Sequence, residues 1–296
     1  MQGERAPDIP GIRFLSVAGR GGMSVVWRAW HERLKREVAV KVMDEAFSRS
    51  AKDVRQFMVE SRAMESLVHP NIVHAMEADC NGGRYYFVMD YVGGYTMGQL
   101  LARKGKISES DSLMTAGAVA DALSYAWSSF GMVHCDIKPD NIMVDLDGTI
   151  KLMDLGLCRA AGVSHANVAD DEVVGTPAYI SPEQIFGDVE LDCRSDIYSL
   201  GATLYHFTAG RMMYPGFSND DTLRAHADPA VKAPDPRRFT PSLSEGFVRI
   251  LEKSLAVDRA ERYAGWDAFL ADVAAVDSGE MPEPFAGAAS SMERGA

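Results

Sequence analysis

The sequence predicts an α+β fold of two lobes, in which a small strand-rich lobe with one main helix precedes a larger, mainly helical lobe. Runs of β-branched and aromatic residues fill much of the first third of the chain. The pair Gly93-Gly94 then breaks the pattern, and helical periodicity dominates beyond it. We therefore expect lobes at 11–92 and 93–275, a loose leader at 1–10 and a flexible tail at 276–296.

The individual elements follow from the spacing of the apolar residues. In the smaller lobe the pattern predicts three strands, one helix and two further strands. These elements are expected at 12–17, 24–30, 37–43, 52–67, near 72–78 and 85–91. In the larger lobe, the clearest helical periods cover 113–127, 195–209 and 244–255.

The bulk composition excludes some classes of function. The net charge of −12 argues against non-specific binding to nucleic acid or to an anionic membrane. The sequence has no apolar run near the ~18 residues that a membrane-spanning helix needs. Its four cysteines form no CxxC pair, so neither zinc nor a redox motif is indicated, and they fit a reducing compartment. We expect a cytoplasmic protein, or the cytoplasmic domain of a longer chain, without a nucleic-acid partner.

A glycine-rich turn joins the first two expected strands. Gly19, Gly21 and Gly22 lie in "AGRGGMSVVWRAW". Because glycine has no Cβ, its backbone N–H can approach a phosphate closely. No helix follows directly and no Lys-Ser/Thr pair closes the loop, so neither a P-loop nor a dinucleotide fingerprint fits. Taken alone, such a turn more often has no role beyond reversing the chain.

One lysine and one glutamate interrupt otherwise apolar patterns. In "REVAVKVMD", Ala39 and Lys41 point to the same face of the third strand. In the following helix, Glu60 lies on the face made by Phe57, Met64 and Leu67. A buried carboxylate needs a partner, and Lys41 is the obvious one. The alternative is that Glu60 lies at the edge of the stripe, in water.

A polar hairpin follows in "HCDIKPDNIMVDLDGTIKLMDLG". Asp147-Gly148 between apolar runs predicts a β-hairpin, and Asn141 and Asp154 are equally far from its middle, so we expect them side by side. Their oxygens suit Mg²⁺. Upstream, Asp136 can accept a proton from a hydroxyl and Lys138 can stabilise negative charge. For the hairpin alone, a mouth of solvated carboxylates is the competing interpretation.

Taken together and in this order, the motifs resemble the eukaryotic-type (Hanks-type) Ser/Thr protein kinase catalytic domain, in particular its bacterial members. The resemblance covers roughly residues 11–273. Many motifs in one order are far more specific than any single one. The matching residues are "GRGGMSVV", "VAVK", Glu60, "HCDIKPDN", "DLG", "GTPAYISPE", "DIYSLG" and Arg262.

The resemblance implies ATP and Mg²⁺ as cofactors and a bilobal protein-kinase-like fold. Lys41, oriented by Glu60, is expected to hold the α/β-phosphates. Asp136 is expected to act as the base towards the acceptor hydroxyl, while Lys138 stabilises the transferring γ-phosphoryl group. The residues expected to bind the metal are Asn141 and Asp154.

The resemblance also implies a nucleotide site. A Gly-rich loop is expected to cover the phosphates, and adenine is expected to lie between apolar side chains with its edge bonded to backbone groups. The loop residues are Ala18, Gly19, Arg20, Gly21, Gly22, Met23 and Ser24. The adenine residues are Val26, Ala39 and Met143, with Met89 as gatekeeper and the backbone of Asp90 and Val92.

The expected partners are protein substrates with Ser or Thr acceptors. Lys138, two residues after the proposed base, resembles Ser/Thr rather than tyrosine kinases, and Thr176 matches the threonine that shapes the acceptor site. A transient homodimer is expected for autophosphorylation. The resemblance further implies a structural ion pair between Glu183 and Arg262.

Three positions depart from the family pattern. Ser24 replaces a loop glycine, and Leu155 replaces the usual Phe of the magnesium motif.

Cys135 replaces the Arg that pairs with a phosphorylated activation loop, and a thiol cannot form this pair. Arg159 remains as a basic contact, and Asp170, Asp171 and Glu172 make the segment acidic. The segment offers Ser164 and Thr176 as hydroxyls. We expect that activation does not depend on phosphorylation of this loop. For Cys135 an inert packed thiol is the favoured interpretation over a redox-sensitive one.

Two other functions remain open at this point. One is a pseudokinase that binds nucleotide or acts as a scaffold, which the intact set of polar residues disfavours. The other is a small-molecule phosphotransferase with a similar catalytic loop. "GTPAYISPE" and "DIYSLG" resemble protein kinases and argue against that second alternative.

Overall fold

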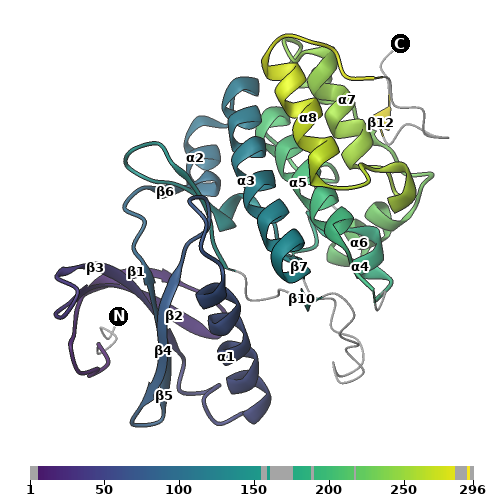
Figure 1. Cartoon of the computed structure of the whole chain (residues 1–296). Helices are drawn as coiled ribbons and strands as arrows, with labels where there is room; N and C mark the ends of the chain where they lie inside the picture. Colours follow the sequence, from purple (N-terminus) through teal and green to yellow (C-terminus); the bar gives the residue numbers. More distant parts are fainter. Residues whose placement is uncertain are drawn as a thin grey trace. The chain divides into compact units, whose positions relative to one another are not determined.

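The chain folds into two compact units, Met1–Gly93 and Gly94–Ala296 (Figure 1). The computed structural model describes residues 6–154, 159–160, 176–187, 190–216, 218–283 and 292–293, with only the backbone at 159, 160 and 293.

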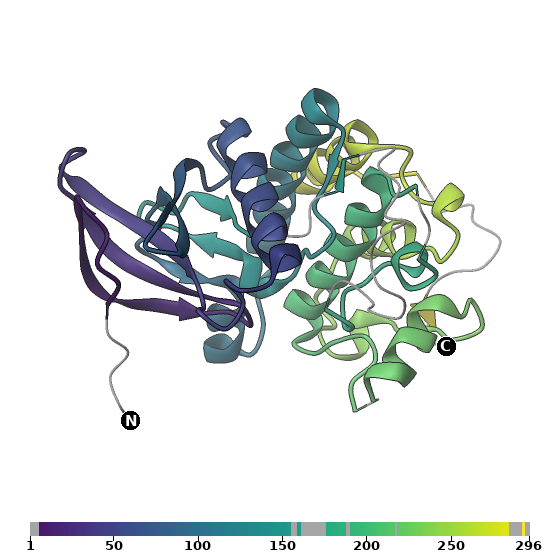
Figure 2. The ribbon, with the colours of Figure 1, turned by 90° about the horizontal axis from the view of Figure 1, so that it is seen from below.

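The smaller unit is built on a five-stranded antiparallel sheet with the order β1-β2-β3-β5-β4. Its strands are β1 (Ile12–Arg20), β2 (Ser24–His31), β3 (Arg36–Met43), β4 (Ala75–Asn81) and β5 (Arg84–Asp90). In Figure 2, β1 to β3 form one curved purple layer. The expected α+β architecture is confirmed, although β4 begins three residues later than the apolar pattern indicates.

One helix, α1 (Ala51–Ser66), packs against β4. Ser50 caps its first turn, because the Ser50 hydroxyl accepts a hydrogen bond from the Asp53 backbone N–H at 3.3 Å. The predicted face is buried, with Phe57, Glu60 and Met64 all turned inward. This helix therefore presents one carboxylate to the interior of the smaller unit.

The expected leader is packed where the structure describes it. Ile9 is only 3% exposed and belongs to the core of the sheet. It forms a bridge with Ile12, and the Asn81 side chain donates a hydrogen bond to the Asp8 carbonyl at 2.8 Å. Residues 8 and 9 are thus part of the smaller unit.

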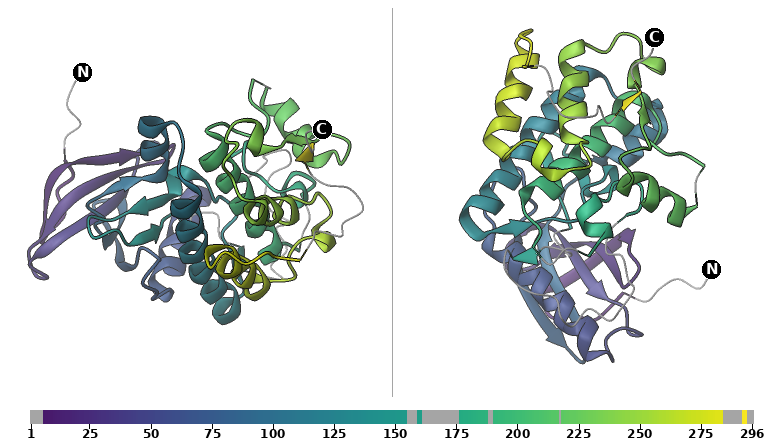
Figure 3. Two further views of the ribbon diagram at one scale, coloured as in Figure 1. Left: turned by 90° about the horizontal axis from the view of Figure 1, so that it is seen from above. Right: turned by 90° about the vertical axis from the view of Figure 1, so that its right-hand side faces the viewer.

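The larger unit is mainly helical. Helices α3, α5, α7 and α8 pack pairwise in a closed circuit, and α8 lies beside α3 and α7 (Figures 1 and 3). Its helices are α2 (Met97–Lys104), α3 (Glu109–Phe130), α4 (Pro182–Ile185), α5 (Cys193–Ala209), α6 (Asn219–Ala227), α7 (Glu245–Ser254) and α8 (Trp266–Asp277). Short 3₁₀ turns cover Pro139–Asn141, Pro236–Arg238 and Arg259–Glu261.

Short strands complete the larger unit. They pair as β6-β8-β9, β7-β10 and β11-β12. Their bounds are β6 (Tyr95–Thr96), β7 (Met132–Val133), β8 (Ile142–Val144), β9 (Ile150–Leu152), β10 (Arg159–Ala160), β11 (Ala233–Pro234) and β12 (Met292–Glu293).

Helix α5 is the buried centre of the larger unit. Almost every residue from Cys193 to Ala209 is buried, which suits a helix that is apolar around most of its circumference. The helix ends at Gly210, whose φ of 70° is costly for other residues. A Cβ at Gly210 would also come within 2.5 Å of the Gly105 carbonyl oxygen, so glycine is required there.

The register of the β8–β9 hairpin differs by one residue from the expected one. Ile142 pairs with Leu152 and Val144 with Ile150. Asn141 therefore lies opposite Met153, whose N–H donates to the Asn141 carbonyl at 2.9 Å, and Asp154 lies one residue further. The cause is the turn, because Asp145 bonds across to Thr149 and the loop between them has three residues.

The expected tail makes contacts at two described places. Arg249 donates a hydrogen bond to the Pro282 carbonyl at 2.7 Å. Met292 is 3% exposed and pairs with Ala233 across β11 and β12. Nowhere in the described ranges is there a helix of the length and apolar character that crossing a bilayer requires.

Candidate active site

The smaller unit holds the expected ion pair between Lys41 and Glu60. The Lys41 ammonium lies 2.5 Å from Glu60 Oε1, and their side chains are 13% and 8% exposed. The ammonium also lies 5.6 Å from the centre of the Phe87 ring. The pairing prediction is therefore confirmed, and the alternative of a solvated Glu60 is wrong. The strand alternation at β3 and the helical period of α1 bring the two charges together.

The expected adenine residues of this unit share one face of the sheet. Val26 pairs directly with Lys41, and Ala39 pairs with Met89 on the other side of β3. Directly opposed residues in antiparallel strands point to the same face, as do residues two apart. Val26, Ala39, Lys41 and Met89 therefore lie on one face. Asp90 ends β5, and the side chain of Val92 is buried just beyond it.

The glycine-rich turn closes between β1 and β2. The Gly21 N–H donates to the Ser24 carbonyl at 2.8 Å. A Cβ at Gly19 or Gly22 would meet nothing within 4 Å. Packing inside the smaller unit therefore does not explain why glycine stands at these two positions.

The larger unit brings three polar side chains together around Asp136. Asp136 Oδ2 accepts from Lys138 Nζ at 2.7 Å and from Asn141 Nδ2 at 3.0 Å. Asp136 Oδ1 accepts from the Thr176 hydroxyl at 2.8 Å, and Lys138 Nζ lies 2.9 Å from the same hydroxyl oxygen. A carboxylate, an ammonium, an amide and an alcohol thus form one closed cluster.

Asn141 and Asp154 carry oxygen atoms of the kind that a hard cation binds. The Asn141 side chain donates from Nδ2 to the Asp136 carbonyl at 2.8 Å and to the Asp136 carboxylate at 3.0 Å. The amide oxygen is therefore the atom that Asn141 can offer to a ligand. Asp154 adopts a positive φ of 54°, which aspartate tolerates better than most residues. Amide and carboxylate oxygens are a donor set that fits Mg²⁺ together with water and phosphate. Met143 lies in β8 of the same hairpin.

A buried aspartate of α5 holds the loop that carries Asp136. Asp196 accepts hydrogen bonds from the backbone N–H groups of His134 at 2.7 Å and Cys135 at 2.9 Å. Burial raises the pKa of Asp196 to about 6, although these bonds and His134 act in the opposite direction. Asp196 lies in the "DIYSLG" motif, for which no role of this residue was predicted. The presence of a carboxylate within an otherwise apolar helix was the feature of the sequence that could have indicated this role.

Gln184 makes a second hydrogen-bond contact with the same loop. Its side chain donates to the Cys135 carbonyl at 2.9 Å. Cys135 itself has a positive φ of 69°, is buried, and packs with Val133 and Leu191. The packed environment agrees with the favoured interpretation of an inert thiol.

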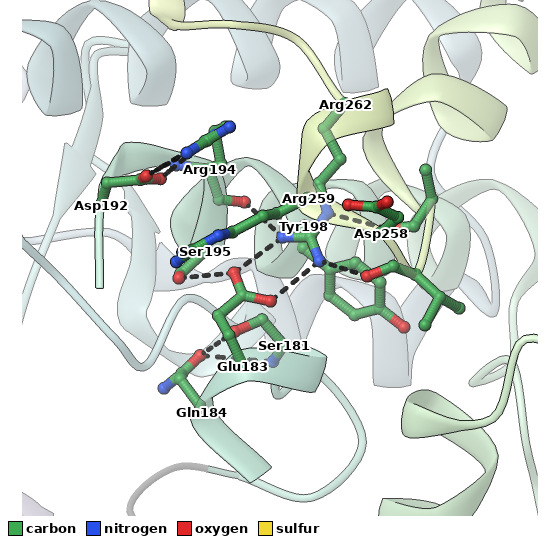
Figure 4. A network of polar contacts seen from close by, with 12 residues as sticks. Ser181, Glu183, Gln184, Asp192, Arg194, Ser195, Tyr198, Asp258, Arg259 and Arg262 are labelled. Atoms are coloured by element: carbon green, nitrogen blue, oxygen red, sulfur yellow. Dashed lines mark hydrogen bonds and ion pairs between the residues drawn. The ribbon is translucent and has the colours of Figure 1, made fainter. Parts of the chain in front are cut away.

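The expected ion pair between Glu183 and Arg262 is present and buried (Figure 4). Two parallel hydrogen bonds of 2.8 and 2.9 Å join them, and Ser195 donates to Glu183 at 2.6 Å. Burial acts to raise the pKa of Glu183, but the bonds and charge of Arg262 outweigh it and the pKa is lowered. Arg262 also stacks over the Tyr198 ring at 4.8 Å. This network ties α4 and α5 to the segment before α8.

The site residues thus fall into two groups, each placed within its own unit. Lys41 and Glu60 meet in the smaller unit, while Asp136, Lys138, Asn141 and Thr176 meet in the larger one. Other expected features lie outside the described residues. These are Leu155, Gly156, Ser164, Asp170, Asp171, Glu172 and the side chain of Arg159.

Comparison with known proteins decides the family. The model of the protein kinase domain matches residues 12–272. The chain belongs to the protein kinase family. Probable serine/threonine-protein kinase PknB of Bifidobacterium longum is 35% identical over 277 residues, which is 90% of this chain and 39% of the relative. Serine/threonine-protein kinase PrkC of Bacillus subtilis is 32% identical over 264 residues, covering 88% of this chain and 40% of the relative.

A third relative extends the same picture. Serine/threonine-protein kinase PknB of Mycobacterium tuberculosis is 34% identical over 272 residues, covering 90% of this kinase-family chain and 43% of the relative. The chain therefore spans about two fifths of the length of these curated relatives.

Proposed function

We propose that this chain is an active, MgATP-dependent serine/threonine protein kinase that transfers the γ-phosphoryl group of ATP to Ser and Thr hydroxyls of proteins. The observation that carries the proposal is the cluster of Asp136, Lys138, Asn141 and Thr176. Family membership and the names of the relatives support the same class of reaction.

Asp136 is the general base of the proposed reaction. The Thr176 hydroxyl at 2.8 Å is a measure of how closely an alcohol oxygen can approach this carboxylate. An acceptor hydroxyl at a similar distance would donate its proton to Asp136 as its oxygen bonds to the γ-phosphorus and the bond to the β-phosphate oxygen breaks. ADP then leaves, and the product is a phosphorylated Ser or Thr.

The cations neutralise the charge of the transferring group. Lys138, 2.9 Å from the Thr176 hydroxyl, is assigned to the γ-phosphoryl oxygens in the transition state. Lys41 is assigned to the α/β-phosphates, and Glu60 fixes the direction of its ammonium through the buried ion pair. Positioned charges of this kind carry most of the rate in phosphoryl transfer.

Asn141 and Asp154 are the proposed magnesium ligands. The amide oxygen of Asn141 and the carboxylate of Asp154 make a hard, oxygen-only donor set. When bound, Mg²⁺ would neutralise phosphate charge. The hydrogen bonds from Asn141 Nδ2 to Asp136 keep the amide in one orientation, so that the base and the metal ligand support each other.

The nucleotide is assigned to the face of the small sheet that carries Lys41. Val26, Ala39, Met89 and Met143 are the apolar contacts of adenine, and the backbone of Asp90 and Val92 bonds its edge. The turn Ala18–Ser24 covers the phosphates. Glycine at 19 and 22 supports this assignment, because no packing within the unit demands it.

We further propose that activity does not depend on phosphorylation of the activation segment. Cys135 is buried and offers no charge to a phosphoryl group at this position. The proposed partners are protein substrates and, transiently, a second copy of the chain during autophosphorylation. The proposed location is the cytoplasm.

The test uses the full chain with radiolabelled MgATP and a peptide library that offers Ser, Thr and Tyr acceptors. Label on Ser and Thr, abolished by Asp136→Asn, is the expected result. Binding of MgADP without any transfer would instead identify a pseudokinase, and label on free small molecules alone would identify a different phosphotransferase. Phosphatase treatment tests the activation proposal, which a large loss of rate reproduced by Ser164→Ala would overturn.

A further inference from the structure

The segment after β5 needs support from side chains. Tyr91 and Val92 belong to no strand or helix, so they take no part in the ladder of backbone hydrogen bonds of the sheet. Under the proposed function, the peptide groups of Asp90 and Val92 bind the edge of adenine. Binding groups on irregular backbone are precise only where neighbouring residues hold them in place.

Arg28 provides one such hold within the smaller unit. Its Nε donates to Glu37 Oε2 at 3.0 Å and its Nη2 donates to Glu37 Oε1 at 2.6 Å. This two-bond fork fixes the plane of the guanidinium. The Arg28 Cζ lies 5.2 Å from the centre of the Tyr91 ring, within the range of a cation–π contact. Glu37 thus orients Arg28, and Arg28 holds Tyr91.

Asp90 is fixed by contacts that do not involve Arg28. Arg36 Nη1 lies 3.1 Å from Asp90 Oδ1, and the Asp90 N–H donates to the His74 carbonyl at 3.0 Å. The residue before Tyr91 is therefore fixed by both its backbone and its side chain. The Arg28 contact is what extends this order to Tyr91 itself.

The position of Arg28 links it to the proposed nucleotide face. Arg28 pairs directly with Ala39, and Val26, two residues earlier, pairs with Lys41. By the alternation of strands, all four side chains share one face of the sheet. The contact between Arg28 and Tyr91 therefore continues the row of residues assigned to the nucleotide.

We propose that Arg28, oriented by Glu37, is a positioning residue that holds Tyr91 and thereby sets the adenine-binding groups of Asp90 and Val92. This inference rests on the proposed nucleotide site. Without the guanidinium, the backbone groups of Asp90 and Val92 must first become ordered before they can bind adenine. The affinity for adenine nucleotides therefore falls, while the contacts to the phosphates remain. We expect the loss to be about fivefold, the size of one partly exposed cation–π contact.

The test is calorimetric titration of the full chain with MgADP and with MgGDP. Arg28→Ala is expected to weaken MgADP binding about fivefold and to change MgGDP binding less, so that the preference for adenine falls. Arg28→Lys should recover part of the affinity, because it keeps the charge but loses the fork to Glu37. Tyr91→Phe should bind MgADP like the wild type. The double variant Tyr91→Ala/Arg28→Ala should bind MgADP no more weakly than either single variant does.

Arg13→Ala is the matched control, since Arg13 forms an exposed pair with Glu32 at 3.6 Å on the same sheet. Unchanged MgADP affinity in Arg28→Ala, with normal binding by the wild type, would overturn the inference. An equal loss for MgADP and MgGDP that follows a lowered Tm would also overturn it, because that result marks a purely structural residue. A wild-type chain that binds neither nucleotide refutes the proposed function itself, which is a separate outcome.

Discussion

The Thr176 hydroxyl donates a hydrogen bond to Asp136 Oδ1 at 2.8 Å, across 40 residues of sequence. The same hydroxyl oxygen accepts from Lys138 at 2.9 Å. Thr176 thus bridges the proposed base and the proposed phosphoryl-stabilising cation. The two charges are themselves in contact at 2.7 Å through Asp136 Oδ2, and the alcohol adds a second link between them through Oδ1.

Replacing Thr176 by Val should lower kcat about 10- to 100-fold, because the base and the lysine lose the hydroxyl that bonds to both and fixes their orientation. Thr176→Ser keeps the hydroxyl and should retain most of the activity. Steady-state kinetics with a peptide substrate measure the effect, and the Kd of MgADP should be unchanged. Equal rates for the Val and Ser variants would contradict a role for the hydroxyl.

Lys41 and Glu60 should behave as a coupled buried pair. Lys41→Met leaves the Glu60 carboxylate desolvated without its partner, which should reduce the free energy of unfolding by about 3 kcal/mol. Glu60→Leu alone should have a comparable effect. The double variant should be more stable than the sum of the single losses predicts, as measured by urea unfolding. Strict additivity of the two losses would show that the contact contributes nothing.

Arg262 is expected to act on stability rather than on the chemical step. Arg262→Met leaves Glu183 charged and buried, and should cost about 3–5 kcal/mol. Because the pKa of Glu183 is lowered by this partner, the paired carboxylate favours the folded state above the ordinary pKa, and this contribution is lost as the pH falls. Thermal unfolding measures the loss, with Arg224→Met, in an exposed pair, as the control. A similar Tm for both variants would exclude a structural role.

His226 should make the larger unit sensitive to mild acid. Its Nδ1 lies 2.7 Å from the Tyr198 hydroxyl, and burial lowers the pKa of His226 to about 4. Between pH 6.5 and 4 the unfolded chain binds a proton here that the folded chain does not, so stability is lost as the pH falls through this window. The full effect is about 3 kcal/mol.

The comparison that isolates this residue is His226→Gln, which does not titrate. Urea unfolding at pH 7 and pH 5 should show a smaller difference between the two pH values for the variant than for the wild type. If the two proteins lose the same free energy of unfolding, His226 is not the source of the acid sensitivity.

Much of the site could be predicted where its residues are close in sequence or follow one period. Asp136, Lys138 and Asn141 fall within six positions, so the local loop brings them together. Lys41 and Glu60 could be paired because each interrupts a regular apolar pattern. The roles of Asp196 and Gln184 in holding the loop were missed, because they depend on contacts across about 50 to 60 residues.

The hairpin shows the limit of a local pattern. The sequence correctly predicts two strands around Asp147-Gly148, yet their register differs by one residue from the expected one and places Met153 opposite Asn141. Turn geometry sets the register, and several turns are compatible with the same dipeptide.

By itself the sequence determined the strand-rich and helical parts, the buried stripe of α1 and the identity of the charged residues, because period, burial and charge are properties of short segments. Only the tertiary structure decided which oxygen of Asp136 bonds to Thr176, that Asp196 anchors the loop, and that Arg28 lies against Tyr91. Those relationships arise when distant segments pack, and the free energy that selects them comes from contacts that no single segment contains.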